Sequence, residues 1–417
     1  GVTEVTAAKN KGNTETTISR YNHLEQKINT CEQNKFQRDY ALFDHQTLGT
    51  AIRQTLDDGF IMTGNAYQTS NYRQVIPLVK TDKDGEIQWS KSYQAKDFSF
   101  AADIQITSEG GYIIGGMTSD YEDSEFLIYL IRTNSSGEMI WSKTYGGPGE
   151  EYFHALKETP DGGFIVVGGT NSSGAGGTDC YILKVDEDGV VEWSKIIGGS
   201  SADYFYDVIA TYDGGYLAVG STRSVGQGGD DMLVMKFGAS GNIEWSDDFG
   251  GSDYEKARSV IQTSDGGYMI SGEYASDGAG GYDICLMKLS NTSNMEWCKL
   301  VGTSTYDYNY SVHQQDDSYV VSGKITSNAI GSGDYMLAKF DLDGNYLWAK
   351  AYGGIEGETT ADMITTSDGG YALFGYTNTF DISTLGDFYM VKTDADGNSG
   401  NCHEMDIIDL IETTASP

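Results

Sequence analysis

Aspartates recur in a short pattern that could bind calcium. Four Asp-x-Asp-Gly segments begin at Asp82, Asp186, Asp341 and Asp394. The calcium loop of an EF-hand needs a longer series of oxygen ligands that ends in a bidentate glutamate. The sequence after these segments lacks that series, so we interpret them as turns, which Asp and Gly favour. We therefore predict no cofactor, with a calcium counter-cation as the alternative.

A second set of carboxylates keeps a fixed distance from another turn. An Asp-Gly-Gly type of turn recurs along the chain, and an acidic residue stands ten positions before four of its copies. Carboxylates that are grouped in space can carry out acid–base chemistry or bind cations. The four residues are Glu151, Asp203, Glu255 and Glu358. Their use depends on the elements that position them.

The turn itself marks an internal repeat. Its copies begin at Asp57, Glu109, Asp161, Asp213, Asp265, Asp316 and Asp368, at steps of 52, 52, 52, 52, 51 and 52 residues. All six tryptophans keep the same spacing, at Trp89, Trp141, Trp193, Trp245, Trp297 and Trp348. A period of this length, held over most of the chain, indicates a repeat architecture.

Each repeat contains four runs that are typical of β-strands. In the third repeat they read FHALKET, GFIVVGGT, DCYILKVD and VVEWSKII. β-Branched and aromatic residues favour strands, and Gly, Asn, Asp and Ser bound each run. Four antiparallel strands in about fifty residues are typical of a propeller blade. We therefore predict an all-β fold, a seven-bladed β-propeller with four-stranded antiparallel blades.

The two ends of the chain are predicted to close the ring. The seventh repeat lacks a recognisable fourth strand, and Asn401 stands in its tryptophan slot. Counting back from the turn at Asp57 places the segment KFQRDYALF, which includes Phe36, in the position of that strand. An N-terminal strand that completes the last blade also removes an open sheet edge.

This closure makes two cysteines neighbours. Cys31 precedes the N-terminal strand and Cys402 follows the last turn, so we predict a disulfide between them. Cys285 and Cys298 lie on adjacent predicted strands and are the candidates for a second disulfide. Cys180 is left as an unpaired thiol on a strand.

The repeat resembles those of a known family. The pattern DGGY…G…D…K.D.DG…W.K.YGG is similar to the kelch-like repeats of secreted microbial β-propellers, over about 365 of the 417 residues. The resemblance implies blades around a central channel, each with its first strand innermost, and an extracellular protein. Copper oxidases with such blades need clustered histidines and tyrosines. Here His45, His154 and His313 fall at three different phases of the repeat, so we predict that the protein is not an enzyme.

Charge and composition restrict the partners. The chain has 27 Lys and Arg against 61 Asp and Glu, a formal net charge of −34. The phosphates of a nucleic acid would be repelled. The sequence has no run of 18 apolar residues, so we predict no membrane-spanning helix. Four glycosylation sequons fall in predicted turns or loops, at Asn134, Asn171, Asn291 and Asn309. With the predicted disulfide they favour a secreted glycoprotein.

The predicted ring also places the second acidic set. Glu151, Asp203, Glu255 and Glu358 belong to the connections that enter the innermost strands. These connections surround one mouth of the channel, and the long glycine-rich loops, such as SSGAGGTD from Ser172, share that face. We expect an acidic channel rim there, either as a docking site or as a solvated rim without a partner.

The chain divides into a polar arm (1–35), the propeller (36–405) and a tail (406–417). The arm has five basic and four acidic residues, and the rest of the chain has 22 and 57, so only the arm is not repelled by the acidic body. The arm residues that we expect at an interface are Thr3, Val5 and Thr6, spaced as in an extended strand, and Tyr21, Leu24 and Ile28, spaced as in a helical turn.

Three classes of function follow. The favoured hypothesis is an extracellular structural propeller that self-assembles head-to-tail into a filament, with the arm docked in the channel or mouth of a neighbouring copy. The alternative is a secreted adhesion propeller that binds glycans or proteins through loops rich in Tyr and Gly. A hydrolase or oxidase at the channel mouth is the third, but an acidic slot common to several repeats is more easily explained by architecture.

Overall fold

The structure is a computed structural model. It describes residues 3–5, 16–17, 29–30, 35–40, 46–68, 73–122, 125–326, 333–378, 386–400, 404–407 and 411–414. Every regular element in these ranges is a β-strand. No helix in these ranges is long and apolar enough to cross a membrane.

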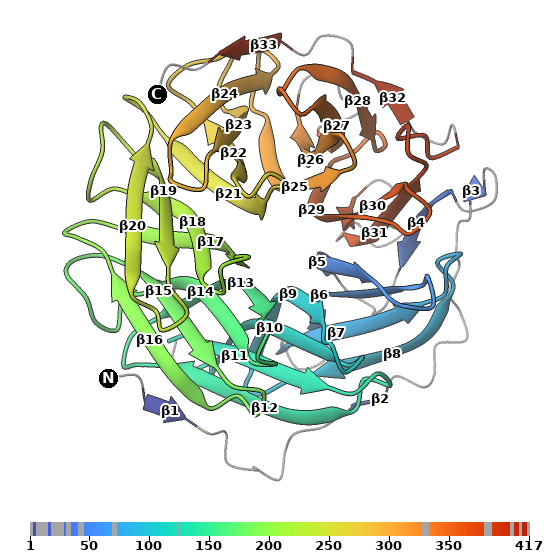
Figure 1. The fold of residues 1–417 in the computed structure, drawn as a ribbon. Helices are drawn as coiled ribbons and strands as arrows, with labels where there is room; N and C mark the ends of the chain where they lie inside the picture. Colours follow the sequence, from blue (N-terminus) through green and yellow to red (C-terminus); the bar gives the residue numbers. More distant parts are fainter. Residues whose placement is uncertain are drawn as a thin grey trace.

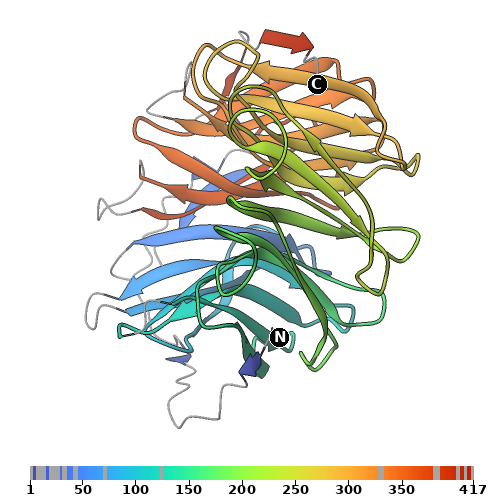
Figure 2. The ribbon, with the colours of Figure 1, turned by 90° about the vertical axis from the view of Figure 1, so that its left-hand side faces the viewer.

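The strands form a propeller around a central hole, seen along its axis in Figure 1 and from the side in Figure 2. Each sequence repeat contributes one innermost strand, which precedes its Asp-Gly-Gly turn, and we number the repeats 1 to 7 in that order. The innermost strands are β5 (Thr47–Gln54), β9 (Phe98–Ile106), β13 (Glu151–Glu158), β17 (Asp203–Ala210), β21 (Glu255–Gln262), β25 (Tyr308–Gln315) and β29 (Glu358–Thr365).

Three further strands follow outwards in each repeat. The second strands are β6 (Phe60–Gln68), β10 (Tyr112–Ser119), β14 (Phe164–Thr170), β18 (Tyr216–Thr222), β22 (Tyr268–Tyr274), β26 (Ser318–Ile325) and β30 (Tyr371–Thr377). The third strands are β7 (Arg73–Thr81), β11 (Leu127–Thr133), β15 (Asp179–Val185), β19 (Asp231–Phe237), β23 (Asp283–Leu289), β27 (Asp334–Asp341) and β31 (Asp387–Thr393). The fourth are β8 (Ile87–Tyr93), β12 (Met139–Gly146), β16 (Val191–Ile197), β20 (Ile243–Phe249), β24 (Met295–Gly302), β28 (Tyr346–Tyr352) and, for repeat 7, β4 (Phe36–Tyr40).

Strand pairing groups these elements into six sheets. One has ten strands, two have four and three have five. The ten-stranded sheet combines repeats 1 and 2, which are joined by a single parallel pair, Gln74 with Phe98. The number of sheets therefore differs from the number of repeats at this one contact.

The predicted closure of the ring is confirmed. Strand β4 pairs antiparallel with β31, with Phe36 opposite Lys392 and Tyr40 opposite Phe388. The Tyr40 hydroxyl donates a hydrogen bond to the Gly85 carbonyl of repeat 1, at 2.9 Å. The N-terminal strand thus supplies the outer strand of the last repeat and also contacts the first.

Five short strands lie outside the four-stranded groups. They come from the two ends of the chain, and each pairs with a fourth strand (Figure 1). They are β1 (Thr3–Val5) on β12, β2 (Thr16–Thr17) on β8, β3 (Asn29–Thr30) on β4, β32 (Glu404–Asp406) on β28 and β33 (Ile411–Thr414) on β24.

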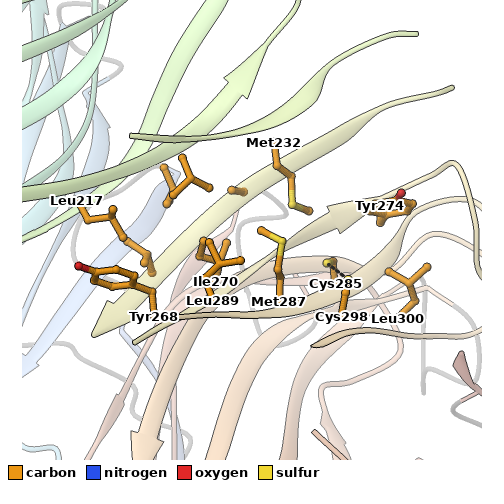
Figure 3. Close-up of a cluster of buried hydrophobic side chains, with 14 residues drawn as sticks. Leu217, Met232, Tyr268, Ile270, Tyr274, Cys285, Met287, Leu289, Cys298 and Leu300 are labelled. Carbon is orange, nitrogen blue, oxygen red and sulfur yellow. Dashed lines mark hydrogen bonds between the residues drawn. The ribbon is translucent and has the colours of Figure 1, made fainter. Parts of the chain in front are cut away.

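The core lies in layers between consecutive repeats. Figure 3 shows one layer, where Leu217 and Met232 of repeat 4 approach Tyr268, Ile270 and Met287 of repeat 5. All five side chains are at most 2% exposed. Burying one such side chain stabilises the fold by about 1.5–3 kcal/mol. Because the layer lies between two repeats, each repeat depends on its neighbours for its core.

The recurrent tryptophan forms part of the same contacts between repeats. The Trp193 ring of repeat 3 lies 5.9 Å from the Tyr216 ring of repeat 4. Gly241, in the last turn of repeat 4, has a φ of 76° and lies over the same indole. A Cβ at that position would be 2.8 Å from Trp193 Cε3. The turn therefore needs a glycine at this position, because any side chain would collide with the indole.

The Asp-Gly-Gly turn also neutralises a buried lysine. Asp213 Oδ1 accepts hydrogen bonds from the Gly215 amide at 3.0 Å and from Lys236 Nζ at 3.1 Å. The Lys236 side chain is only 2% exposed. In repeat 2 the pair is Glu109 with Arg132, at 3.2 Å. Repeat 2 thus keeps the ion pair with two longer side chains, Glu in place of Asp and Arg in place of Lys.

Two predictions about modification need correction. Asn309 lies in β25, not in a loop, and is fully buried, with its side-chain oxygen accepting from Ser271 Oγ at 2.7 Å. A glycan cannot be attached there in the folded protein. Cys285 and Cys298 are free thiols whose sulfur atoms lie 3.4 Å apart, against about 2.05 Å in a disulfide. Met287 stands opposite Cys298, so the two cysteines are diagonal neighbours (Figure 3).

The remaining predicted modification sites differ in what the structure describes. Asn171 and Asn291 are exposed, and Asn134 is half-buried with its side-chain oxygen accepting from the Ser136 amide at 3.0 Å. Cys31 and Cys402 lie outside the described residues.

Candidate functional site: the central channel

The innermost strands share a distortion that builds the channel wall. In every repeat, the pairing of the first strand with the second skips one residue at the same position. A β-bulge of this kind re-aims a side chain and is frequent beside functional sites. All seven bulged residues line one hollow of about 360 Å³ in the channel. They are Thr50, Ala102, His154, Tyr206, Arg258, Tyr310 and Ala361.

The bulged residues divide the channel into two unlike halves. Repeats 3 to 6 contribute the four large polar side chains of the set, whereas repeats 7, 1 and 2 contribute Ala361, Thr50 and Ala102. The wall of the hollow therefore has large polar side chains on one side and small residues on the other.

The large side chains contact one another. The His154 ring lies 4.9 Å from the Tyr206 ring in an edge-on arrangement. The Arg258 guanidinium lies over the Tyr206 ring, 4.7 Å from its centroid. Arg258 Nη2 donates to Glu273 Oε2 at 3.0 Å. His154 Nε2 and Arg258 Nε are buried without a hydrogen-bond partner within the described residues, so they can bind a polar ligand.

The surroundings of His154 keep its imidazole neutral. Burial lowers the pKa of His154 to about 4, and the Arg258 charge acts in the same direction. Burial likewise lowers the pKa of His313 to about 4. Burial lowers the pKa of Arg258, but the Glu273 carboxylate outweighs this and raises it overall. At neutral pH the channel therefore has neutral imidazoles beside a fixed guanidinium.

Charged side chains that follow the bulged residues along the innermost strands form ion pairs between repeats. Arg53 of repeat 1 donates through Nη2 to Asp103 of repeat 2, at 2.7 Å, and through Nη1 to Asp362 of repeat 7. Asp362 also accepts from the Ile52 amide at 3.1 Å. Lys157 Nζ lies 3.7 Å from Asp207 Oδ1, which joins repeats 3 and 4.

Tyrosines surround the mouth where the innermost strands begin. The Tyr204 and Tyr206 rings are nearly parallel, 6.1 Å apart with an interplanar angle of 11°. Tyr152 lies 6.0 Å from Tyr204. In repeats 5 and 6, Tyr282 lies 5.8 Å from Tyr306, which is 53% exposed. Aromatic rings with polar tips are suited to contact sugars or peptides at such an opening.

The expected acidic rim is not exposed. Glu151, Asp203, Glu255 and Glu358 stand at the starts of innermost strands, as predicted, but each is at most 2% exposed and none lines the hollow. Their carboxylates turn into the seams between repeats, because hydroxyls and amides bind them there. Thr170 Oγ1 donates to Glu151 at 3.1 Å, and the Gly199 amide donates to Asp203 at 2.9 Å. Burial raises the pKa of Glu151, against the opposing effect of Ser172.

The Asp-x-Asp-Gly segments are turns, as predicted. Asp186 Oδ1 accepts from the Asp188 and Val190 amides, at 3.0 and 2.7 Å. Asp341 does the same with the Asp343 and Asn345 amides, at 3.0 and 2.8 Å. The first aspartate thus closes its own turn. No group of three or more His, Cys, Asp or Glu side chains converges on a metal position within the described ranges.

The wall residues had a signal in the sequence that motif reading missed. His154, Tyr206 and Arg258 each stand seven positions before their turn. The residue at the corresponding position changes from each repeat to the next, in contrast to the turn and the tryptophan, which recur. Of the expected interface residues, Thr3 and Val5 lie in β1, and Thr6, Tyr21, Leu24 and Ile28 lie outside the described residues, as does His45.

Comparisons with known proteins give similarities of fold. No family model matches the chain, and no curated protein matches it. The β-propeller domain of the Trilobed protease from Pyrococcus furiosus is 9% identical, with a TM-score of 0.48 over 86% of this chain and 98% of that one. Sqt1 from Chaetomium thermophilum is 12% identical, with a TM-score of 0.46 over 85% and 90%. The acylaminoacyl peptidase from Pyrococcus horikoshii is 11% identical, with a TM-score of 0.47 over 84% and 52%. At these identities no activity is carried over.

Proposed function

We propose that this protein is an extracellular structural β-propeller that assembles with copies of itself through its N-terminal arm. We count seven kelch-like blades, one per sequence repeat, because the ten-stranded sheet holds two four-stranded groups joined by one residue pair. The observation that carries the proposal is the way in which the outer edges of these blades are used.

Outer edges accept additional strands in most blades. The two ends of the chain add a strand to β12, β8, β4, β28 and β24. Within the described residues, β16 and β20 receive none, so repeats 3 and 4 form four-stranded sheets. An edge strand presents unpaired amides and carbonyls, which serve as a template for another chain. Two adjacent edges of the same ring are therefore available to a neighbour.

An open edge is a better dock for the arm than the channel. The channel hollow of about 360 Å³ is walled by large side chains such as Tyr206 and Arg258, which leave little room for an extended chain. The arm segment Thr3–Val5 already pairs in this chain with an outer strand, β12. A strand that leaves one ring and pairs with the edge of the next makes a heterologous contact, which builds filaments.

Charge favours β20 as the acceptor. This strand carries Glu244, Asp247 and Asp248 within seven residues, and Glu244 and Asp248 are exposed. The arm has a net charge of +1, whereas the rest of the chain has −35, counted as 22 basic and 57 acidic residues. Opposite charge steers the arm to this edge, while like charge discourages two β20 edges from pairing with each other.

Electron microscopy of the full chain and of a variant without residues 1–28 tests the proposal. We expect filaments from the full chain and single rings from the shortened one, which keeps β3 and β4. The double substitution Asp247→Lys, Asp248→Lys should reduce assembly. The matched control is Glu187→Lys, Asp188→Lys, the same charge change in an exposed turn beside β16. Filaments from the shortened chain, or single rings at every concentration of the full chain, would refute the proposal.

A secreted glycan- or protein-binding propeller is the second candidate, and the tyrosines at the channel mouth favour it. The parallel pair Tyr204 and Tyr206 offers a stacking surface beside Arg258. Binding to a glycan array should be lost on Tyr204→Ala and kept on Tyr212→Ala. Tyr212 is 74% exposed but lies in the turn at the other end of β17, so it controls for the loss of a surface tyrosine.

A further inference from the structure

Paired carboxylates lie buried in the seam between repeats 3 and 4. Asp179 begins β15 and Asp203 begins β17, and they are 1% and 2% exposed. Both carboxylates crowd Gly198: a Cβ added there would overlap Asp179 Oδ1 and would lie 2.7 Å from Asp203 Oδ2. The two carboxylates therefore come together against the same glycine.

The arrangement recurs in the next two seams. Asp231 and Glu255 come together against Gly250, where an added Cβ would overlap Asp231 Oδ1 and lie 2.9 Å from Glu255 Oε2. Asp283 and Asp307 do the same beside Gly302, with the added Cβ 3.0 Å from Asp307 Oδ2. These four acids are at most 2% exposed. Three consecutive seams thus bury two like charges each.

In two of the three pairs, protein groups satisfy one carboxylate but leave an oxygen of the other without a partner. Asp203 accepts from Ser224 Oγ at 2.7 Å and from the Gly199 amide at 2.9 Å, and Asp307 accepts from the Thr303 amide at 2.6 Å. Asp179 Oδ1 and Asp283 Oδ1, the atoms that crowd the glycine, are buried without a hydrogen-bond partner within the described residues. Burying an unpaired carboxylate lowers the stability of the fold by roughly several kcal/mol, even after the structure relaxes, unless a cation or a proton compensates its charge.

We propose that each of these three seams binds a hard divalent cation of the calcium type between its two carboxylates. Ca²⁺ takes oxygen ligands at about 2.3–2.6 Å, so one ion bound between the two acids can contact both. Backbone carbonyls, hydroxyls such as Ser224 and water supply the remaining oxygens, as is usual for this ion. The cation joins the third strand of one blade to the first strand of the next.

The other seams of the same ring support this assignment. Where one acid is missing, the chain places a neutral residue in the seam: Leu127 stands opposite Glu151 beside Gly146. In the seam between repeats 6 and 7, both acids are present as Asp334 and Glu358, and the Lys324 ammonium interacts with both. Among the residues that the structure describes, the paired acids of the three seams that we assign thus differ from Asp334 and Glu358 in having no lysine that interacts with both.

Calcium binding to the full-length protein, stripped with EDTA and desalted, tests the proposal. Equilibrium dialysis with ⁴⁵Ca²⁺ should give about three tight equivalents, one per seam. Asp179→Asn and Asp283→Asn should each remove one equivalent. Glu151→Gln is the matched control, because it removes an acid that also has a buried, unpartnered oxygen, in the seam where Leu127 replaces the second acid. It should leave the stoichiometry unchanged.

Thermal unfolding gives a second, independent readout, because the effect of Asp283→Asn on the melting temperature should have opposite signs in EDTA and in Ca²⁺. In EDTA, Asp283→Asn should melt higher than the wild type, because it relieves the repulsion with Asp307. In millimolar Ca²⁺ it should melt lower, because it has lost a ligand. Equal stoichiometry in all variants, or a wild-type melting temperature that does not respond to Ca²⁺, would overturn the proposal. So would a shared proton, which would appear as a melting temperature in EDTA that rises from pH 7 to pH 5 without any response to Ca²⁺.

Discussion

The ion pairs of Arg53 allow a quantitative test of how the ring is held closed. This side chain in β5 binds Asp103 in β9 and Asp362 in β29, and so spans repeats 7, 1 and 2. The substitution Arg53→Met keeps the length of the side chain and leaves two carboxylates without their cation. Asp103 is 6% exposed, so water cannot fully compensate it.

The expected cost follows from these contacts. Removing one partner of a buried ion pair destabilises a protein by about 3–5 kcal/mol. The Arg53 side chain is 19% exposed to the channel, which places the effect at the lower end, about 3 kcal/mol. The free energy of unfolding in urea measures it. Adding Asp362→Asn to the variant should recover about 1 kcal/mol, because it removes one of the two unpaired charges.

The matched control removes a cation where solvent screens it. Lys83 pairs with Asp84 at 2.8 Å, but the side chains are 56% and 53% exposed. Lys83→Met should therefore leave the free energy of unfolding unchanged within the error of the measurement. A loss of under 1 kcal/mol for Arg53→Met, or equal losses for both variants, would refute the reasoning.

Three further predictions concern the channel, the seams and the cysteines. The pKa of about 4 for His154 and His313 lies below the unfolded value of 6.5, so their stabilising contribution is complete above pH 6.5 and is lost towards pH 4. Both rings meet channel water, so we expect about 1 kcal/mol each, measured as the difference in urea stability between the wild type and the double Gln variant at pH 7 and pH 4.5. Trp193→Ala should lower the free energy of unfolding by about 2–3 kcal/mol, less than for a fully buried indole, and an effect under 0.5 kcal/mol would show that the repeat does not depend on this packing. Thiol titration in urea without reductant should count three free thiols, because Cys285 and Cys298 are reduced and the two cysteines near the chain ends are predicted to be bridged; a count of one would mean that Cys285 and Cys298 are bridged, and a count of five that no bridge exists.

The sequence was sufficient for the architecture because each repeat states its own boundaries. The Asp-Gly-Gly turn and the tryptophan occur at fixed positions, and both make contacts between repeats that any copy must preserve. Counting in repeats even placed Phe36 on the last blade, where it stands opposite Lys392. Turn chemistry was equally local, since Asp186 bonds only to amides within its own turn.

The site was harder to predict because it depends on contacts between repeats. Asp203 was expected at an exposed rim, since its sequence neighbours are loops, but its hydroxyl and amide donors bury it. Asn309 matches a sequon but lies in a strand, where Ser271 of the preceding repeat holds it. A one-dimensional pattern does not contain the partner that a side chain finds on the next blade.

The position of the acidic residues changes how the net charge of −34 should be understood. Charges on an exposed rim are screened by salt and affect mainly the encounter with partners. Asp179 and Asp283 are instead buried between blades, where their repulsion acts on the ring itself. Divalent cations therefore should matter more for the integrity of repeats 3 to 6 than for recognition at the mouth. The open edges β16 and β20 belong to repeats 3 and 4, so cation loss and loss of assembly should occur together there.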